Sequence, residues 1–430
     1  MIDTKLTQRI APVSVHVKEA GEGQAYIVAS VHLPMDAADA AAHCYSQIAE
    51  LLSNRELEIV HERVFGNLET EQIVKDVRRN LFHKYGIPYD TAVTYIEGNP
   101  PWGKGLAGVI IRAVASGENH DRIRTIRDND IPVGRGWQRK GSRFLILQNM
   151  QGVRDDSSLL NTRPLQTQRM IEHANRILCE QGASYSDVFR TWIYLSHINE
   201  WYREFNHARN YTYDRFGITP SSDNNDKMLP ASTGIEGRSR TGAACTMDLI
   251  ALISPPLMGG DQGEGERQSA YCDSALNKSK PLIKRLSNPH QIEPFHYYSA
   301  FSRGILIQES DVLSIQVSGT AAIDEHGASL YPGDIRSQIA CTLEKIEALI
   351  GQEGANLNDI CAATAFVKRS EHAAIFSEIS TKRGLNELAV VCVVADICRE
   401  ELLFEMDAEV VVNERGQGAG GPGGSGISGM

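Results

Sequence analysis

The sequence predicts an α+β protein built from three copies of one unit, a mixed sheet that carries two helices on one face. Two observations support this prediction. The order strand, helix, strand, helix, strand, strand occurs three times along the 430 residues. The segments that close the three units can also be aligned with one another. Such a repeat indicates that each unit buries one sheet face under its own helices, so three sheets could close around a common centre.

The first unit, residues 1–115, shows the patterns that define the repeat. Strands are predicted where apolar and polar residues alternate, and helices where Ala, Ile and Leu recur every three to four residues. The first helix also begins with an acid, Asp36, at a capping position. After a lead-in over 1–23 with a first strand, the expected elements are strand Tyr26–Leu33, helix Asp36–Leu52, strand Leu57–Phe65, helix Glu69–Tyr85, and strands Thr91–Glu97 and Leu106–Ala115.

The same order returns in residues 144–253 and 295–413. In the second unit we expect strand Phe144–Met150, helix Arg163–Gln181, strand Asp187–Ser196, helix Glu200–Phe216, and strands Leu229–Glu236 and Ala243–Ile253. In the third we expect strand Leu313–Ala322, helix Ile335–Ile350, strand Ile360–Lys368, helix Glu371–Arg383 and the closing stretch Glu387–Val412. A connection over 116–143 and a surface linker over 254–294 separate the units. The Gly-rich tail, 414–430, is expected to be disordered.

The closing stretch Glu387–Val412 carries the main candidate for chemistry. Its second strand places Leu402, Phe404, Met406 and Ala408 on one face, and Leu403, Glu405, Asp407 and Glu409 on the other. An apolar face under helices and an acidic face toward a cleft would suit a proton donor. Acidic residues on an amphipathic strand are more often its solvent-exposed side, and that interpretation stays open.

Aligning the three closing segments adds an asymmetry. Val109, Thr246 and Glu405 share one position in the alignment, so only the third unit carries an acid there. The sequence therefore favours one working site over three equal ones, and the first unit is expected to be non-catalytic.

Composition limits the kinds of partner. The net charge of -11 and the pI near 5.7 argue against nucleic acid or an anionic membrane. No apolar run approaches the ~20 residues needed to span a bilayer, and the amino terminus lacks the apolar core of a signal peptide. The eight cysteines form no CxxC pair, and the histidines show no HExxH spacing. We expect a cytoplasmic protein with reduced thiols and no metal.

The repeated unit resembles the YjgF/Rid fold, which normally trimerises, so the three units would form an intramolecular pseudo-trimer in a monomer or a weak homo-oligomer. Several motifs are also similar to those of the chorismatases: LPASTGIEG at 229–237, FRTWIYLSHIN at 189–199, YREF with a later Arg at 202–209, YYSAFSRG at 297–304, SGTAAIDEHG at 318–327 and ADICREELLFEMD at 395–407. The similarity covers roughly Thr91–Val412. The complete first unit departs from the family pattern, as does Ile193, where the family tends to have Asn.

This resemblance implies cofactor-free cleavage of chorismate, a small dicarboxylate, into pyruvate and a cyclic carboxylic acid. Cleaving the enol ether requires a general acid that protonates its methylene carbon and is itself protonated near neutral pH. Glu405 matches the catalytic Glu of the family, and the neighbouring Leu403, Phe404 and Asp407 would favour its protonated form.

The two carboxylates of chorismate call for Arg and Tyr side chains. Arg209 and Tyr202 lie seven residues apart on a predicted helix and therefore on one face. Tyr297 and Arg303 lead into the third unit. Core packing for the tyrosines and surface ion pairing for the arginines remain the alternatives. Two weaker candidates are Arg190 and Lys368.

Two positions sort the family by product. This chain has Cys398 and Gly319, the pattern of members that form 3-hydroxybenzoate, whereas dihydrodiol-forming members have Ala at both places. A thiol beside the ring could assist rearrangement of an epoxide-like intermediate, while Gly makes room. A dihydrodiol or 4-hydroxybenzoate product stays open, and so does a purely structural role for Cys398 as a small buried hydrophobe.

Two other functions stay open. An enamine/imine deaminase of the Rid type would hold its substrate with an Arg on the strand before the last, where this chain has Ser232 and Val390. A non-catalytic ligand-binding or scaffold protein could use the first unit as a platform for partners.

Overall fold

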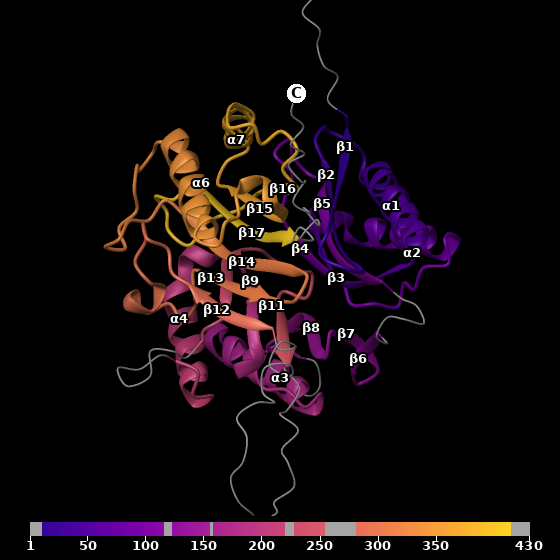
Figure 1. The fold of residues 1–430 in the computed structure, drawn as a ribbon, viewed down its shortest axis with the longest axis horizontal. Coiled ribbons are helices and arrows are strands. Elements are labelled where there is room, and N and C mark those ends of the chain that lie inside the picture. Colours follow the sequence, from indigo (N-terminus) through magenta and orange to yellow (C-terminus); the bar gives the residue numbers. More distant parts are fainter. Residues whose placement is uncertain (1–10, 116–122, 155–157, 220–227, 254–280, 414–430) are drawn as a thin grey trace, which may run out of the picture.

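The computed structural model confirms the three-unit architecture. Each unit is a mixed sheet with two helices on one face, and the helices lie on the outside of the molecule around three inner sheets (Figure 1). The structure describes residues 11–115, 123–154, 158–219, 228–253 and 281–413. The predicted tail, 414–430, and most of the predicted linker, 254–280, lie outside the described residues.

The first unit forms a five-stranded sheet in the order β1-β2-β5-β3-β4. Only the pairing of β3 with β4 is parallel. Its elements are β1 Val13–Glu19, β2 Gln24–Val31, α1 Ala37–Asn54, β3 Leu57–Gly66, α2 Glu71–Lys84, β4 Thr94–Glu97 and β5 Leu106–Ala115.

The second unit forms a six-stranded sheet in the order β10-β9-β11-β8-β7-β6, with β9 and β10 parallel. Its elements are β6 Arg124–Asp128, β7 Ile131–Arg139, β8 Ser142–Gln151, α3 Arg163–Glu180, β9 Val188–Leu195, α4 Ile198–Arg215, β10 Ala231–Glu236 and β11 Cys245–Ile253.

The third unit forms a six-stranded sheet in the order β12-β13-β14-β17-β15-β16, with β15 and β16 parallel. Its elements are β12 Leu282–Leu286, the short 3₁₀ helix η4 Pro294–Tyr297, β13 Gly304–Gln308, β14 Val312–Ala321, α6 Ile335–Gly351, β15 Ile360–Val367, α7 His372–Lys382, β16 Val390–Val394 and β17 Phe404–Asn413.

Capping side chains begin the first long helix of each unit. The carboxylate of Asp36 accepts a hydrogen bond from Ala38 N and starts α1, as the sequence predicts. Asp334 does the same for α6 through Ser337 N, and the Thr162 hydroxyl accepts from Leu165 N at the start of α3. Each helix then buries one face, because its apolar residues recur every three to four positions.

The apolar core has four parts. Three clusters each fill the space between one sheet and its own two helices. A fourth lies at the centre, where the inner faces of the sheets meet, and draws residues from every unit, among them Phe65, Tyr194 and Val391. Three sheets closed around one centre therefore bury both faces of each sheet, which is the intramolecular pseudo-trimer.

The structure differs from the sequence prediction at two connections, and it adds β13 ahead of the first strand predicted for the third unit. Residues 124–139, placed in a connection over 116–143, form the hairpin β6–β7, which extends the second sheet. Its turn residues Asn129 and Asp130 have φ of 46° and 64°, the left-handed conformation that a tight hairpin turn requires. Residues 282–286, placed in the linker, form β12 at the edge of the third sheet. Strands β6 and β12 lie at sheet edges and carry charged residues, so apolar alternation does not reveal them.

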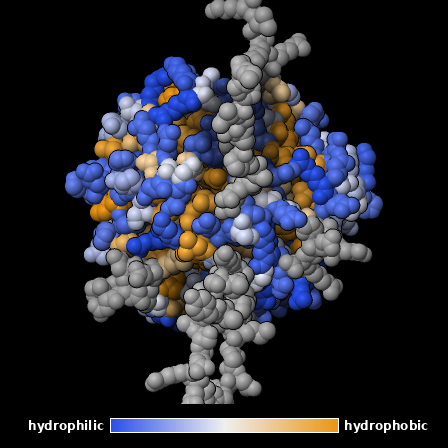
Figure 2. Space-filling view, in the orientation of Figure 1, coloured by the Kyte–Doolittle hydropathy of each residue, from blue (hydrophilic) through white to orange (hydrophobic). Residues whose placement is uncertain are grey.

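Hydrophilic side chains cover much of the face seen in Figure 2, with hydrophobic residues interspersed. Among the described residues, no helix is long and apolar enough to cross a membrane. Within the same residues, no group of three His, Cys, Asp or Glu side chains is arranged to hold a metal ion.

Candidate active site

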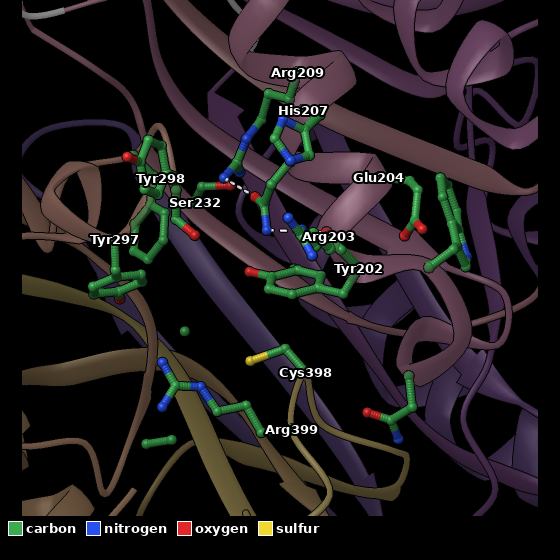
Figure 3. Close-up of a pocket in the computed structure, with 18 of the residues that line it drawn as sticks. Tyr202, Arg203, Glu204, His207, Arg209, Ser232, Tyr297, Tyr298, Cys398 and Arg399 are labelled. Atoms are coloured by element: carbon green, nitrogen blue, oxygen red, sulfur yellow. Dashed lines mark hydrogen bonds between the residues drawn. The ribbon is translucent and has the colours of Figure 1, made fainter. Parts of the chain in front are cut away.

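A pocket of about 840 Å³ lies at the junction between the second and third units. The second unit contributes α4 and β10, and the third contributes β14, β17 and the segments before β13 and β17. Pockets of this size hold small organic molecules. In Figure 3, Arg209 and His207 lie on one side of the pocket and Arg399 on the other, with Tyr202 and Cys398 between them.

Glu405 is the second residue of β17 and lies at the inner end of this pocket. Phe404, Met406 and Ala408 point into the core under the helices of the third unit, so the alternation of the strand turns Glu405 the other way. Asp407 also lies on that inner face. The whole face is buried, and Glu405 is only 5% exposed. The interpretation of these acids as the solvent-exposed side of a strand is therefore wrong.

The Glu405 carboxyl is held in its protonated form. Burial, and to a smaller extent the nearby Asp407 carboxylate, raise its pKa to about 8 against the opposing effect of Arg303. At neutral pH the neutral acid predominates. A carboxylic acid that retains its proton at neutral pH is suited to general-acid chemistry.

Gly319 lies against this carboxyl group. The register of β14 on β17 shifts between Val317 and Thr320, which marks a β-bulge at Gly319. A Cβ atom on residue 319 would overlap Oε1 of Glu405 and would lie 3.3 Å from Cγ2 of Thr233. Glycine therefore gives the carboxyl group the room that it occupies.

Cys398 lines the pocket from the segment between β16 and β17. Burial raises the pKa of its thiol to about 12, and the Glu405 carboxyl adds to the effect. The side chain is therefore a neutral thiol at neutral pH. It also packs against two apolar clusters, so a structural role as a small hydrophobe is compatible with its position.

Helix α4 presents Tyr202, Asn206 and Arg209 to the pocket at positions i, i+4 and i+7, which share one face. Asn206 Nδ2 donates to the Tyr202 carbonyl, and Arg209 Nη2 donates to Asn206 Oδ1 at 2.7 Å. Arg209 is 1% exposed, and its Nε has no hydrogen-bond partner among the described residues. It is therefore not a surface ion pair.

Tyr297 and Arg303 form a second polar group in the pocket. Arg303 Nη2 donates to Tyr297 Oη at 2.9 Å, and the guanidinium also donates to the Ile292 carbonyl. Arg303 is 2% exposed. Among the residues described, neither Arg209 nor Arg303 has a carboxylate partner within 4 Å, whereas other arginines such as Arg190 and Arg215 do. A buried guanidinium without a counter-ion favours an anionic ligand.

All seven residues predicted from the sequence thus line one pocket: Glu405, Cys398, Arg209, Tyr202, Tyr297, Arg303 and Gly319. Their roles remain predictions. The two weaker candidates lie elsewhere. Arg190 pairs with Asp407 in the interior at 3.1 Å, and Lys368 donates to the Glu400 carbonyl.

Several pocket residues escaped the sequence prediction. Arg399 follows Cys398 directly, and its Nη1 donates to the Gly327 carbonyl at 2.7 Å. Asn206 could have been found from its spacing, because it lies three residues before Arg209 on the same helical face. Ser232 and Gly234, on the edge strand β10, lie within the motif LPASTGIEG but were not singled out as pocket residues.

The other two junctions between units differ from this one. The pairing of strands shows which residues of the other two units correspond to Glu405. Glu405 lies opposite Phe366, and the residues in the same place of the other sheets are Gly108, opposite Phe65, and Thr246, opposite Tyr194. The predicted alignment with Val109 is therefore wrong by one residue, and Val109 packs in the core under α1 and α2. A Cβ on Gly108 would lie 2.8 Å from the Val391 side chain, so apolar packing fills the position that corresponds to Glu405.

Comparisons with known proteins agree with this architecture. The model of the family described as Endoribonuclease L-PSP matches residues 296–412. A RutC family protein of Pyrococcus abyssi is 30% identical over 95 residues, which cover 22% of this chain and 75% of that protein. The fold and the junction pocket thus define a protein of the YjgF/Rid (L-PSP) superfamily. Within that superfamily, the chain is similar to chorismatases and to a 3-hydroxybenzoate synthase.

Two of these relatives show the extent of the similarity. A 3-hydroxybenzoate synthase of Streptomyces hygroscopicus is 25% identical over 254 residues, which cover 53% of this chain and 64% of that protein. The chain therefore spans slightly less than two thirds of this relative. The crystal structure of a chorismatase matches with a TM-score of 0.55 and 20% sequence identity, over 82% of this chain and 93% of that one. This second likeness concerns the fold.

Proposed function

We propose that this protein cleaves the enol ether of chorismate without a cofactor, releasing pyruvate and 3-hydroxybenzoate. The observation that carries the proposal is the buried Glu405 carboxyl, protonated at neutral pH, in a pocket with two buried arginines that have no carboxylate partner among the described residues. A carbon acceptor takes up a proton slowly, so the donor must be protonated and held in place. Glu405 meets both conditions.

The pocket fits a dicarboxylate. Arg209 with Asn206 lies on the side of the second unit, and Arg303 with Tyr297 lies on the side of the third. Each group offers a cation together with a polar neighbour, which is the pairing that carboxylates favour. In this proposal the two carboxylates of the substrate neutralise the two buried guanidinium groups and hold the enol ether beside Glu405.

The reaction then follows from the ionisation states. The Glu405 carboxyl gives its proton to the methylene carbon, and positive charge develops at the ether carbon. The ring C–O bond breaks as the neighbouring ring hydroxyl closes on the same carbon, and the proton of that hydroxyl returns to Glu405. The ether oxygen leaves with the three-carbon fragment as the keto oxygen of pyruvate, and an epoxide-like intermediate stays on the ring. Formation of 3-hydroxybenzoate consumes no net water, whereas a dihydrodiol requires one water molecule. Cys398, as a neutral thiol beside the ring, assists the rearrangement of an epoxide-like intermediate to the aromatic product.

Incubating the purified chain with chorismate tests the proposal directly. We expect pyruvate and 3-hydroxybenzoate to appear in equal amounts, at a rate far above that of spontaneous breakdown. Pyruvate without 3-hydroxybenzoate would overturn the assignment of the product. Absence of pyruvate above the spontaneous rate would overturn the enzymatic function as a whole.

The deaminase alternative gains no support from the pocket. The position where a Rid-type deaminase would carry its Arg holds Ser232, whose hydroxyl accepts from Thr191 and whose backbone N–H donates to Ser318 Oγ. Release of ammonia from a dehydroamino acid would be needed to revive that function.

A further inference from the structure

Strand β17 carries three carboxyl groups in a row. Glu405, Asp407 and Glu409 alternate with core residues and therefore share one face, with neighbours about 7 Å apart along the strand. They are 5%, 2% and 3% exposed. Only Glu405 lines the pocket, while the other two lie deeper, where the three units meet. Three buried acids on one face cannot all be ionised unless cations compensate them.

The deeper acids have such partners, and each partner comes from a different unit. Arg190 on β9 of the second unit lies 3.1 Å from Asp407 Oδ2, which also accepts from the Thr233 hydroxyl at 2.8 Å. Arg63 on β3 of the first unit lies 3.4 Å from Glu409 Oε1. In the described part of the chain, Glu405 makes no ion pair of this kind.

The two arginines are fixed by a shared aromatic ring. The guanidinium carbons of Arg63 and Arg190 lie 4.2 and 4.3 Å from the centre of the Trp192 ring. Cation–π attraction and burial hold both groups in place. Burial lowers the pKa of Arg190 to about 10, which still leaves its guanidinium charged at neutral pH.

We propose that Arg63 of the first unit and Arg190 of the second keep Glu409 and Asp407 ionised, so that Glu405 alone holds a proton. Two positive and two negative charges then balance in the interior, and the unpaired acid at the pocket is the proton donor. None of the described residues that line the pocket comes from the first unit. That unit nevertheless contributes to the chemistry, because Arg63 is a positioning residue for the proton.

The other groups that face these acids do not change the balance. Two further buried charges lie one residue away from these acids: Arg112 next to Tyr26 and Cys361, and Asp248 next to Tyr194 and His61. The titratable and charged side chains that act on the acids themselves, besides those already named, are Arg303, Cys398 and Tyr202 at Glu405, Tyr194 at Asp407, and Tyr26, Cys361 and His61 at Glu409. Burial raises the pKa of every phenol and thiol among them and lowers that of His61, so these groups are neutral. Arg303 acts on Glu405 in the opposite direction.

Infrared titration of the full chain would test this proposal without relying on turnover. The carbonyl band of a protonated carboxylic acid should be present at neutral pH in the wild type and absent from Glu405→Gln. Removing one cation by Arg63→Gln leaves two carboxylates with one guanidinium. We expect one of two results. Either a second carboxylic acid band appears at neutral pH, or the proton affinity of the Glu405 carboxyl rises ~10-fold or more, so that its band persists to higher pH.

Matched variants separate this effect from a loss of packing. Arg78→Gln removes another buried arginine of the first unit, paired with buried Glu62 on the side of α2. It should add a carboxylic acid band from Glu62, while the Glu405 band, identified by its loss in Glu405→Gln, should titrate as in the wild type. Arg63→Lys keeps the charge and should resemble the wild type. An Arg63→Gln protein that folds but titrates like the wild type would overturn the proposal.

A second variant covers the case in which Arg63→Gln does not fold. Asp407→Asn leaves Arg190 uncompensated beside Glu405, so the Glu405 band should disappear at lower pH than in the wild type. An unchanged titration would also overturn the proposal. Pyruvate release and the infrared titration test different claims. A protein that shows the expected carboxylic acid bands but releases no pyruvate would refute the proposed function and leave the charge arrangement intact.

Discussion

The carboxyl group of Glu405 occupies the space that a side chain at Gly319 would need. The two residues come from neighbouring strands, β17 and β14, and the bulge in β14 brings the Gly319 backbone against Oε1 of Glu405. The acid of the pocket therefore has its position set from one side by the absence of a side chain. This relationship ties together two residues that the sequence associated only through a family pattern.

Replacing Gly319 by Ala should displace the acid rather than unfold the protein. The new methyl group would meet the end of a flexible side chain, which can rotate away. A displacement of about 1 Å costs roughly 10²-fold in rate, so pyruvate release should fall by ~10- to 100-fold. Steady-state kinetics would measure the fall, with thermal unfolding as a control. An Ala variant with full activity would show that the position of the carboxyl is not critical.

Replacing Glu405 by Gln should abolish the proton donor and keep the shape of the pocket. General-acid catalysis typically contributes 10²- to 10⁴-fold, so we expect pyruvate release to fall by ~10²-fold or more. Binding of chorismate should survive, since Arg209 and Arg303 are untouched, and calorimetric titration would measure it. Retention of full activity would rule out Glu405 as the acid.

Replacing Cys398 by Ala should separate the two stages of the reaction. Ether cleavage should continue at a similar rate, because Glu405 is unchanged, while the product shifts from 3-hydroxybenzoate toward a dihydrodiol. Chromatography of the aromatic and cyclohexadiene products would measure the ratio. If Cys398→Ala lost pyruvate release as completely as Glu405→Gln, the proposed division of roles would be wrong.

Replacing Arg209 by Gln should weaken substrate binding more than chemistry. A hydrogen bond to a charged group contributes about 1.5–3 kcal/mol, so KM should rise by ~10- to 100-fold with a smaller change in kcat. Arg215→Gln offers a matched control on the same helix, because Arg215 pairs with Glu172 at the surface. Equal effects of both substitutions would point to damage of α4 rather than to loss of a substrate contact.

The raised pKa of Glu405 also predicts how stability depends on pH. The pKa in the folded state, about 8, lies above the ordinary value of 4.5, so protonated Glu405 favours the folded state. This contribution is complete below pH ~4.5 and is lost as the pH rises through ~8, and it amounts to on the order of 3–5 kcal/mol.

The melting temperature of the wild type should therefore fall more between pH 6 and pH 9 than that of Glu405→Gln, because only the wild type has a buried carboxyl group that becomes charged in this range. Glu387→Gln, at a residue that is 91% exposed, provides the control and should follow the wild type. Parallel curves for the wild type and Glu405→Gln would mean that Glu405 is ionised throughout this range.

The sequence by itself determined the three units and the helices and most strands of each, and its resemblance to a known family pointed to seven of the pocket residues. It could do so because sheet faces buried under helices impose regular alternation, as in β17, and because caps such as Asp36 mark where helices begin. The charged edge strands β6 and β12 carry little apolar alternation, so they went unpredicted.

Only the tertiary structure decided which acids lie at the pocket and which lie at the centre. Glu405, Asp407 and Glu409 look alike in the sequence, with the same alternation and the same charge. Their difference arises because Arg190 and Arg63 reach two of them from sheets more than 200 residues away in the chain. Local pattern carries no record of such contacts. The proton at Glu405 is therefore a property of how the three sheets close on one another.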